Sequence, residues 1–394
     1  MKHFLTAAGI VITLAFQPRH AEAQRGIEAA TAAFKDDVHA SAGLTCDACH
    51  TGMAQGGERD AAVPRTAVAP LCARCHSDAG YMRTFDPQVR IDQLAQYLTS
   101  THGTRMAAGD VRVATCSDCH LAHGITRVRD PRSPVAPLNV ATTCGRCHGD
   151  AARMGPFGRD TAPPDDWSAS VHAAALLKRG DTSAPTCSSC HGSHGAAPPG
   201  AASVADVCAQ CHVRQAELFR ASPKKAIFDE IGQAECLACH GNHRIESPAD
   251  SWIGLNDGAV CAQCHDETLG GAQAIRDVRQ QLDRLSAAVA AADAVLTRAE
   301  RAGMLVDEGR LALREARDHL LHSRVLVHAF AVQPLAAMAA EGATAARRAQ
   351  DGGDGAIREI DVRRRGLAVA TVLVFAFLLT LWWKIQRLPD IHRE

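Results

Sequence analysis

All 16 cysteines of this 394-residue chain belong to one motif, Cys-x-x-Cys-His, which occurs eight times. Two thiols three residues apart, followed directly by an imidazole, form the attachment site of a c-type haem. The sulfurs bond to the porphyrin edge, and the histidine binds the iron on one face. Zinc ribbons and disulfide frameworks also use paired cysteines, but neither requires a histidine after every pair. The sequence therefore predicts eight covalently bound c-type haems.

Each motif supplies two thioether sulfurs and one proximal iron ligand. The predicted thioether residues are Cys46, Cys49, Cys72, Cys75, Cys116, Cys119, Cys144, Cys147, Cys187, Cys190, Cys208, Cys211, Cys236, Cys239, Cys261 and Cys264. The predicted proximal ligands are His50, His76, His120, His148, His191, His212, His240 and His265.

From about residue 24 to residue 270 the chain consists of four repeats with two motifs each. In the second and third repeats, a Ser-x-His segment precedes the first motif and a His-Gly pair follows it. The upstream histidines are His102 and His172, and the downstream ones are His123 and His194. These four histidines are candidate distal ligands for the opposite faces of the irons.

The first and fourth repeats keep this pattern with substitutions. The first has His39 upstream, but Met53 occupies the downstream position; the fourth has His243 downstream, but Lys224 occupies the upstream position. Methionine and lysine can both bind haem iron, so both residues are candidates. The simpler interpretation, a packing methionine and a solvated lysine, is the one we favour from the sequence.

Composition favours a fold that is mainly α with much irregular loop and almost no sheet. Aromatic residues make up only 4% of the chain, which is little for a large side-chain core, so the domain at 24–270 should pack around its haems. Segments between the motifs are rich in alanine, glycine and proline, as loops are. Because haem binding and folding are then coupled, the apoprotein should be largely unfolded.

Residues 271–350 contain no cysteine and predict an α-helical hairpin. Apolar residues recur at spacings of three and four from Ile275 to Ala299 and again from Leu313 to Phe330, and Pro334 should bend the second helix. His328 lies on an apolar face of that helix, so it is a further distal candidate that would join the hairpin to an iron. His319 and His322 are weaker candidates on the same helix.

The two ends of the chain predict export and membrane attachment. Residues 1–23 have the features of a signal peptide that ends in Ala-Glu-Ala. Residues 351–366 form a predicted linker, because three glycines at 352–355 should break the helix, and the uncharged residues 367–383 are long enough for one transmembrane helix. Residues 384–394 would be a cytoplasmic tail, although the arginines at 363–365 then lie on the outer side, against the usual charge bias.

The paired motifs, with Ser-x-His upstream of Cys187 and Cys-His-Gly-x-His from Cys190 to His194, resemble the multihaem cytochromes c of the cytochrome c3-like or NapC/NirT-like type. The resemblance covers nearly the whole mature chain and implies extracytoplasmic electron transfer through mostly bis-histidine, low-potential haems. In that family a histidine usually follows the Ser-Pro that here leads to Lys224, so the ligand of one haem stays open. The NapC-type quinol dehydrogenases differ from this chain in having an N-terminal anchor and fewer haems.

Two functions are compatible with these features. The first is a membrane-anchored electron carrier in the cytoplasmic membrane, with its haem domain on the periplasmic side, whose partners are other redox proteins such as a quinol-oxidising complex. The alternative is an octahaem oxidoreductase acting on nitrite, hydroxylamine or tetrathionate, which requires one iron with an open sixth position. All eight motifs end in histidine and the ligand candidates outnumber the irons, which favours the carrier. A net charge of −1 argues against a nucleic-acid partner, and the oligomeric state is left open.

Overall fold

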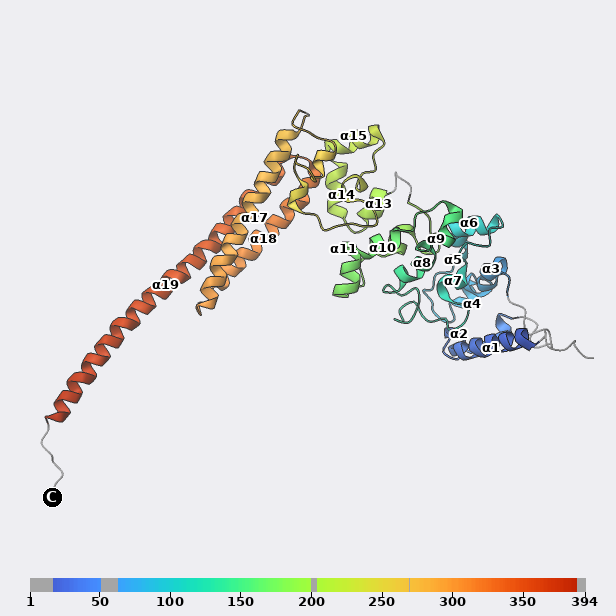
Figure 1. Ribbon diagram of the computed structural model, residues 1–394, viewed down its shortest axis with the longest axis horizontal. Coiled ribbons are helices and arrows are strands. Elements are labelled where there is room, and N and C mark those ends of the chain that lie inside the picture. Colours follow the sequence, from blue (N-terminus) through green and yellow to red (C-terminus); the bar gives the residue numbers. More distant parts are fainter. Residues whose placement is uncertain (1–16, 51–62, 200–203, 269, 388–394) are drawn as a thin grey trace, which may run out of the picture. The chain divides into compact units, whose positions relative to one another are not determined.

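The computed structural model describes residues 17–50, 63–199, 204–268 and 270–387 (Figure 1). Throughout these ranges the regular elements are helices, and no strand occurs, which confirms the mainly α prediction. The chain divides into two compact units. The first unit comprises Met1–Val207 with His240–Ser247, and the second comprises Cys208–Cys239 with Pro248–Glu394.

The first unit is built from short helices separated by loops. Its apolar core is small, with Trp167, Ala173 and Leu176 as the buried cluster. Large side chains are too few to fill such a unit, as the low aromatic content predicts. The helices are α1 (Gln17–Phe34), α2 (Val38–Ser41), α3 (Arg65–His76), α4 (Ala79–Met82), α5 (Gln93–Thr99), α6 (Thr101–Ala107), α7 (Cys116–His120), α8 (Val140–His148), α9 (Ala151–Met154), α10 (Pro163–Ser168), α11 (Val171–Ala173) and α12 (Cys187–His191), with α13 (Val204–Ala209) and α16 (Leu237–His240) at the boundary between the units.

The second unit contains a bundle of three long helices. α17 (Ala272–Arg301), α18 (Asp307–Leu326) and α19 (Val332–Gln386) lie side by side over the first part of α19 (Figure 1). Their seam is apolar, with Leu282, Leu296, Leu313 and Leu335 almost fully buried. The shorter α14 (Val213–Arg220) and α15 (Pro223–Ile231) belong to the same unit.

The predicted two-helix hairpin is therefore incomplete, because a third helix packs on it. α18 ends at Leu326, and the chain reverses at Phe330, whose φ of 49° lies in the left-handed region. Pro334 consequently lies in the first turn of α19, where proline is tolerated, and it does not bend α18.

The predicted helix break at 351–355 is also wrong. α19 continues through this segment and through the predicted linker 351–366. A Cβ on Gly353 would lie 2.5 Å from Val295 Cγ1, and one on Gly342 would lie 2.8 Å from His319 Cβ. These glycines let α19 approach its neighbours closely. Each glycine makes the helix about 1 kcal/mol less stable than alanine would, and the close packing outweighs this cost.

The end of α19 is apolar and exposed. Residues such as Leu367, Phe375 and Trp383 are more than half exposed. Within the described ranges, α19 is the one helix that is long and apolar enough to cross a membrane, and none of its apolar window is buried. Residues 1–16 of the predicted signal peptide lie outside the described residues.

Candidate metal centres

The motifs lie on short helical segments that place the two sulfurs and the imidazole together. Motifs at α7 and α12 form one complete turn each, and those at Cys46–Ala48 and Cys261–Gln263 form 3-10 turns. At α7 the backbone N–H of Thr115 donates to the Asp118 carboxylate at 2.8 Å, which fixes the start of the helix. Because one turn covers three to four residues, both thiols and the histidine of a motif can face one bound group.

Five predicted proximal histidines each face one predicted distal histidine. The ring centroids lie 6.0–6.1 Å apart in every pair. The pairs are His50 with His123, His76 with His39, His120 with His194, His148 with His102, and His191 with His243.

This separation fits a metal ion between the rings. Two imidazoles on one ion, with a metal–nitrogen bond of about 2 Å on each side and half of each ring beyond it, have centroids about 6 Å apart. The same centroid separation occurs five times, each time between a predicted proximal and a predicted distal histidine. This repetition favours iron ligation over ordinary ring packing. The residues present therefore fit haem iron.

Burial keeps several of these imidazoles in the form that binds metal. Desolvation is the largest cause that lowers the pKa of the partly buried ligands, and neighbouring histidines lower most of these pKa values further. The lowered pKa favours the neutral imidazole, which is the ligating form. This applies to His76, His102, His120, His148, His194 and His243.

Asp37 orients the first of the distal ligands. Its carboxylate is 1% exposed and lies 2.9 Å from His39 Nδ1, and it also accepts from the backbone N–H groups of His39 and Ile125. With Nδ1 as the donor to this carboxylate, Nε2 carries the free lone pair and is the atom that could bind a metal.

The upstream ligands share one local structure. In each repeat a buried residue occupies the N-cap position of a helix, and the ligand candidate follows two positions later; these residues are Asp37, Ser100, Ser170 and Ser222, of which Ser222 makes no side-chain cap hydrogen bond. The Oγ of Ser100 accepts from Gly103 N, and that of Ser170 accepts from Ala173 N. A helix N-cap thus fixes where each of these ligand side chains starts.

The pairs follow two rules of register. A first-motif histidine faces the downstream histidine of the next repeat, as His50 faces His123. A second-motif histidine faces the upstream histidine of its own repeat, as His148 faces His102. Sequence analysis missed these rules, although each downstream histidine follows the proximal histidine of its motif by three residues in the second, third and fourth repeats, which was the available signal. Met53 lies outside the described residues. It occupies the downstream position of the first repeat, which by the first rule would serve the repeat before it.

Lys224 follows the second rule without being a histidine. Its Nζ lies 2.8 Å from Nε2 of His265, the proximal histidine of the last motif. The favoured expectation of a solvated lysine is therefore wrong, because Lys224 is partly buried against this ring. Burial and then the lysine charge lower the pKa of His265.

The pairs described so far leave two proximal histidines, His212 and His240. They also leave two distal candidates, His172 and His328. All four have interaction partners in the structure. His328 is partly buried, and its Nδ1 lies 2.9 Å from the Val325 carbonyl. Burial lowers its pKa, as does neighbouring His212, while the hydrogen bond to Val325 opposes this.

The other two histidines of the hairpin face elsewhere. His319 Nδ1 lies 3.0 Å from Met338 Sδ, inside the bundle, and His322 is exposed on α18. Of the three hairpin histidines, His328 is thus the one with a ligand-like environment.

Thiols of consecutive motifs are neighbours from the first motif to the fifth and again from the sixth to the eighth. Contact with Cys72 of the second motif lowers the pKa of Cys116 in the third to about 7, before haem attachment consumes the thiols. The same contact joins the fourth and fifth motifs and the sixth and seventh. Neighbouring thiols also contribute, after burial, to raised pKa values, and they link Cys49 with Cys75, Cys119 with Cys147, and Cys239 with Cys261 and Cys264.

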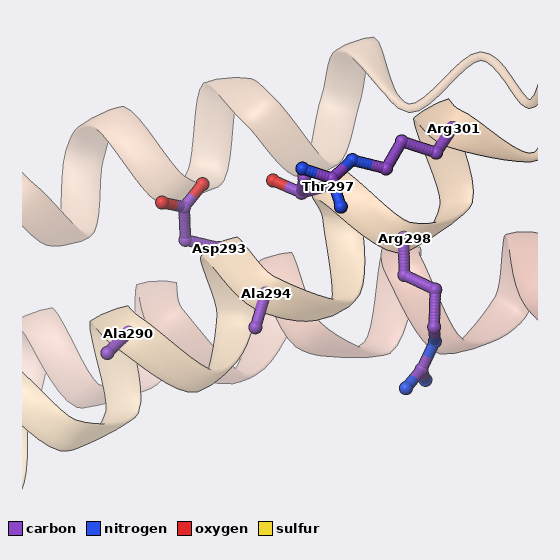
Figure 2. Close-up of a pocket in the computed structure, with 6 residues that line it drawn as sticks. All are labelled: Ala290, Asp293, Ala294, Thr297, Arg298 and Arg301. Carbon is purple, nitrogen blue, oxygen red and sulfur yellow. The ribbon is translucent and has the colours of Figure 1, made fainter.

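A hollow of about 510 Å³ on α17 carries no motif residue. Figure 2 shows its lining, in which Asp293 is the acidic group. The Asp293 carboxylate is bound by Arg310 and Arg317. The hollow therefore offers no free carboxylate and is not a candidate site.

Comparison with known proteins gives one match. A family model described as cytochrome c3 matches residues 38–149 and 179–266, just over half of the chain, and these ranges contain all eight motifs. No curated protein and no solved structure matches the chain.

Proposed function

The chain belongs to the cytochrome c3 family, and from this membership we propose that it is an octahaem electron carrier held at the outer face of the cytoplasmic membrane. The family establishes a multihaem c-type cytochrome that transports electrons. The count of eight, the anchor and the partners are our proposal. The observation that carries it is the set of five facing histidine pairs, each at 6.0–6.1 Å.

Eight irons need eight distal ligands, and the repeats supply seven. These are the six free histidines of the repeats, namely His39, His102, His123, His172, His194 and His243, together with Lys224. We assign the missing ligand to His328, which is partly buried and whose Nδ1 lies 2.9 Å from the Val325 carbonyl. His172 and His328 then serve the two motifs that end in His212 and His240.

The chain's residues suit electron transfer because they occupy both axial positions. Bound haem supplies one-electron chemistry at its iron. Neutral imidazoles on both sides leave no position for a substrate, and fixed ligands keep the structure unchanged between oxidation states. Within each unit, thiols of successive motifs are neighbours. Haems bound to these thiols would therefore follow one another in sequence order, close enough for electrons to move from one to the next.

The anchor fits a donor in the membrane. The exposed apolar end of α19 would hold the haem domain beside quinol-oxidising proteins, and soluble redox proteins would accept the electrons. The alternative, an octahaem oxidoreductase, needs an open iron. Six of the eight proximal histidines already face a ligand candidate, which weighs against that alternative.

The test is an EPR spectrum of the oxidised, detergent-solubilised protein with haem quantified on the same sample. We expect eight haems per chain and only low-spin ferric signals. A high-spin signal equal to one iron in eight would overturn the carrier in favour of the oxidoreductase. A haem content well below eight would refute the proposed cofactor count.

A further inference from the structure

We infer that Lys224 is the sixth ligand of the last haem, opposite His265, so that this haem alone has histidine–lysine ligation. The inference rests on the proposed octahaem function and deepens it. It concerns a ligand that differs in chemistry from the imidazoles around it, and therefore a haem that can be told apart from the others.

The first argument is local equivalence. Ser222 occupies the N-cap position of α15 and Lys224 follows two positions later, as His102 follows Ser100 and His39 follows Asp37. In those two cases the residue faces the second-motif histidine of its own repeat. The last repeat obeys the same register with an amine in place of an imidazole.

The second argument is the environment of the amine. Within the described part of the chain Lys224 has no ion pair with a carboxylate, whereas the adjacent Lys225 pairs with Asp229 and Glu235. The Lys224 Nζ instead points at His265 Nε2, and the Phe330 ring centroid lies 6.0 Å from it on another side. Both lysines are partly buried, so it is the partner of the amine that distinguishes Lys224 from Lys225.

The third argument is reach. Two nitrogens on one iron stand about 4 Å apart, twice a metal–nitrogen bond of about 2 Å. The present separation of 2.8 Å must therefore widen by about 1 Å when iron lies between. A lysine stem with four rotatable bonds can make this adjustment without moving α15.

The fourth argument is the support from the helical bundle. Phe330 stands at the reversal between α18 and α19, with a left-handed φ of 49°, and its ring packs edge-on against Phe219 of α14 at 6.2 Å. This residue ties the bundle to the part of the same unit that carries Lys224. The amine is thus held from its own helix and backed by the bundle.

The experiment compares Lys224→Ala, Lys224→His and the matched control Lys225→Ala in the full-length holoprotein. Haem content, EPR and near-infrared magnetic circular dichroism are recorded, because the charge-transfer band of a ferric haem distinguishes lysine from histidine ligation. We expect the unsubstituted protein and K225A to show seven bis-histidine irons and one histidine–lysine iron. K224A should turn one iron in eight high-spin and allow it to bind one cyanide per chain. K224H should show eight bis-histidine irons.

The inference is overturned if K224A, with eight haems, stays fully low-spin, or if the lysine band is absent from the unsubstituted protein. If K224A loses haem, the spectrum of K224H decides the question. Loss of the lysine band in K224H supports the inference, and persistence of that band overturns it. A protein without eight haems would instead refute the proposed function, so the two failures are distinguishable.

Discussion

The Asp37→Asn substitution tests whether a buried carboxylate tunes the second haem through its distal ligand. Asp37 lies 2.9 Å from His39 Nδ1 and is almost fully buried. A carboxylate that accepts from the ligand ring makes the imidazole a stronger donor and stabilises the more positive ferric iron. Asparagine keeps the shape but has one acceptor oxygen, so with that oxygen at His39 the substitution removes the charge and also the hydrogen bond from the Ile125 N–H.

The expected shift follows from the difference between two kinds of hydrogen bond. A bond to a charged group contributes about 1.5–3 kcal/mol and a neutral one about 0.5–1.5, so the change is about 1–1.5 kcal/mol. At about 59 mV per 1.4 kcal/mol for one electron, the midpoint potential of one haem should rise by about 40–60 mV.

The assay is a spectroelectrochemical titration of the holoprotein, fitted as eight one-electron steps. Asp36→Asn is the matched control, because Asp36 is the exposed neighbour and should leave all potentials unchanged. A shift below about 10 mV in D37N, a fall in potential, or an equal rise in D36N would refute the idea that this carboxylate acts through His39.

Two further predictions concern α19. Gly353→Ala should lower the free energy of unfolding by about 1–3 kcal/mol relative to the control Gly355→Ala. A Cβ on Gly353 would lie 2.5 Å from Val295 Cγ1, whereas a Cβ on Gly355 would lie 3.8 Å from Arg358 Nη2 and meet nothing else. Equal thermal midpoints of the two variants would contradict the packing role. A stop codon in place of Leu367 removes the apolar segment and should move the cytochrome from the membrane fraction to the soluble fraction with its haems retained; a truncated protein that still sediments with membranes would count against the anchor.

The sequence predicted the covalent chemistry because that chemistry is local. A thiol pair and the next histidine are fixed by one helical turn, so spacing alone identifies Cys187, Cys190 and His191. The pairing of His50 with His123 joins different repeats, and no local pattern contains it. Only the register of successive repeats, once several pairs are known, shows which histidine faces which.

Helix ends were harder to predict than helix seams. The buried seam positions of α17, such as Leu282 and Leu296, follow the predicted spacing. Glycines at 352–355 predict a break because propensity is counted one residue at a time, whereas in the structure contacts with Val295 and Leu296 keep the helix intact. Phe330 reverses the chain after α18 by a left-handed turn that a bulky residue rarely adopts, so no sequence rule would place the reversal there.

The departures at the two ends of the repeat array have one explanation. If each downstream histidine serves the preceding repeat, as the ring pairs indicate, the first repeat needs none at Met53 and the array as a whole falls one ligand short. Terminal units of repeat proteins are commonly completed by different structure. Under our proposal the bundle supplies His328, whose Nδ1 lies 2.9 Å from the Val325 carbonyl. His328→Ala should then turn one iron in eight high-spin, whereas His322→Ala, an exposed position on α18, should leave all eight low-spin. Low-spin spectra from both variants would mean that the eighth ligand lies elsewhere and that the bundle serves only as a connection to the membrane.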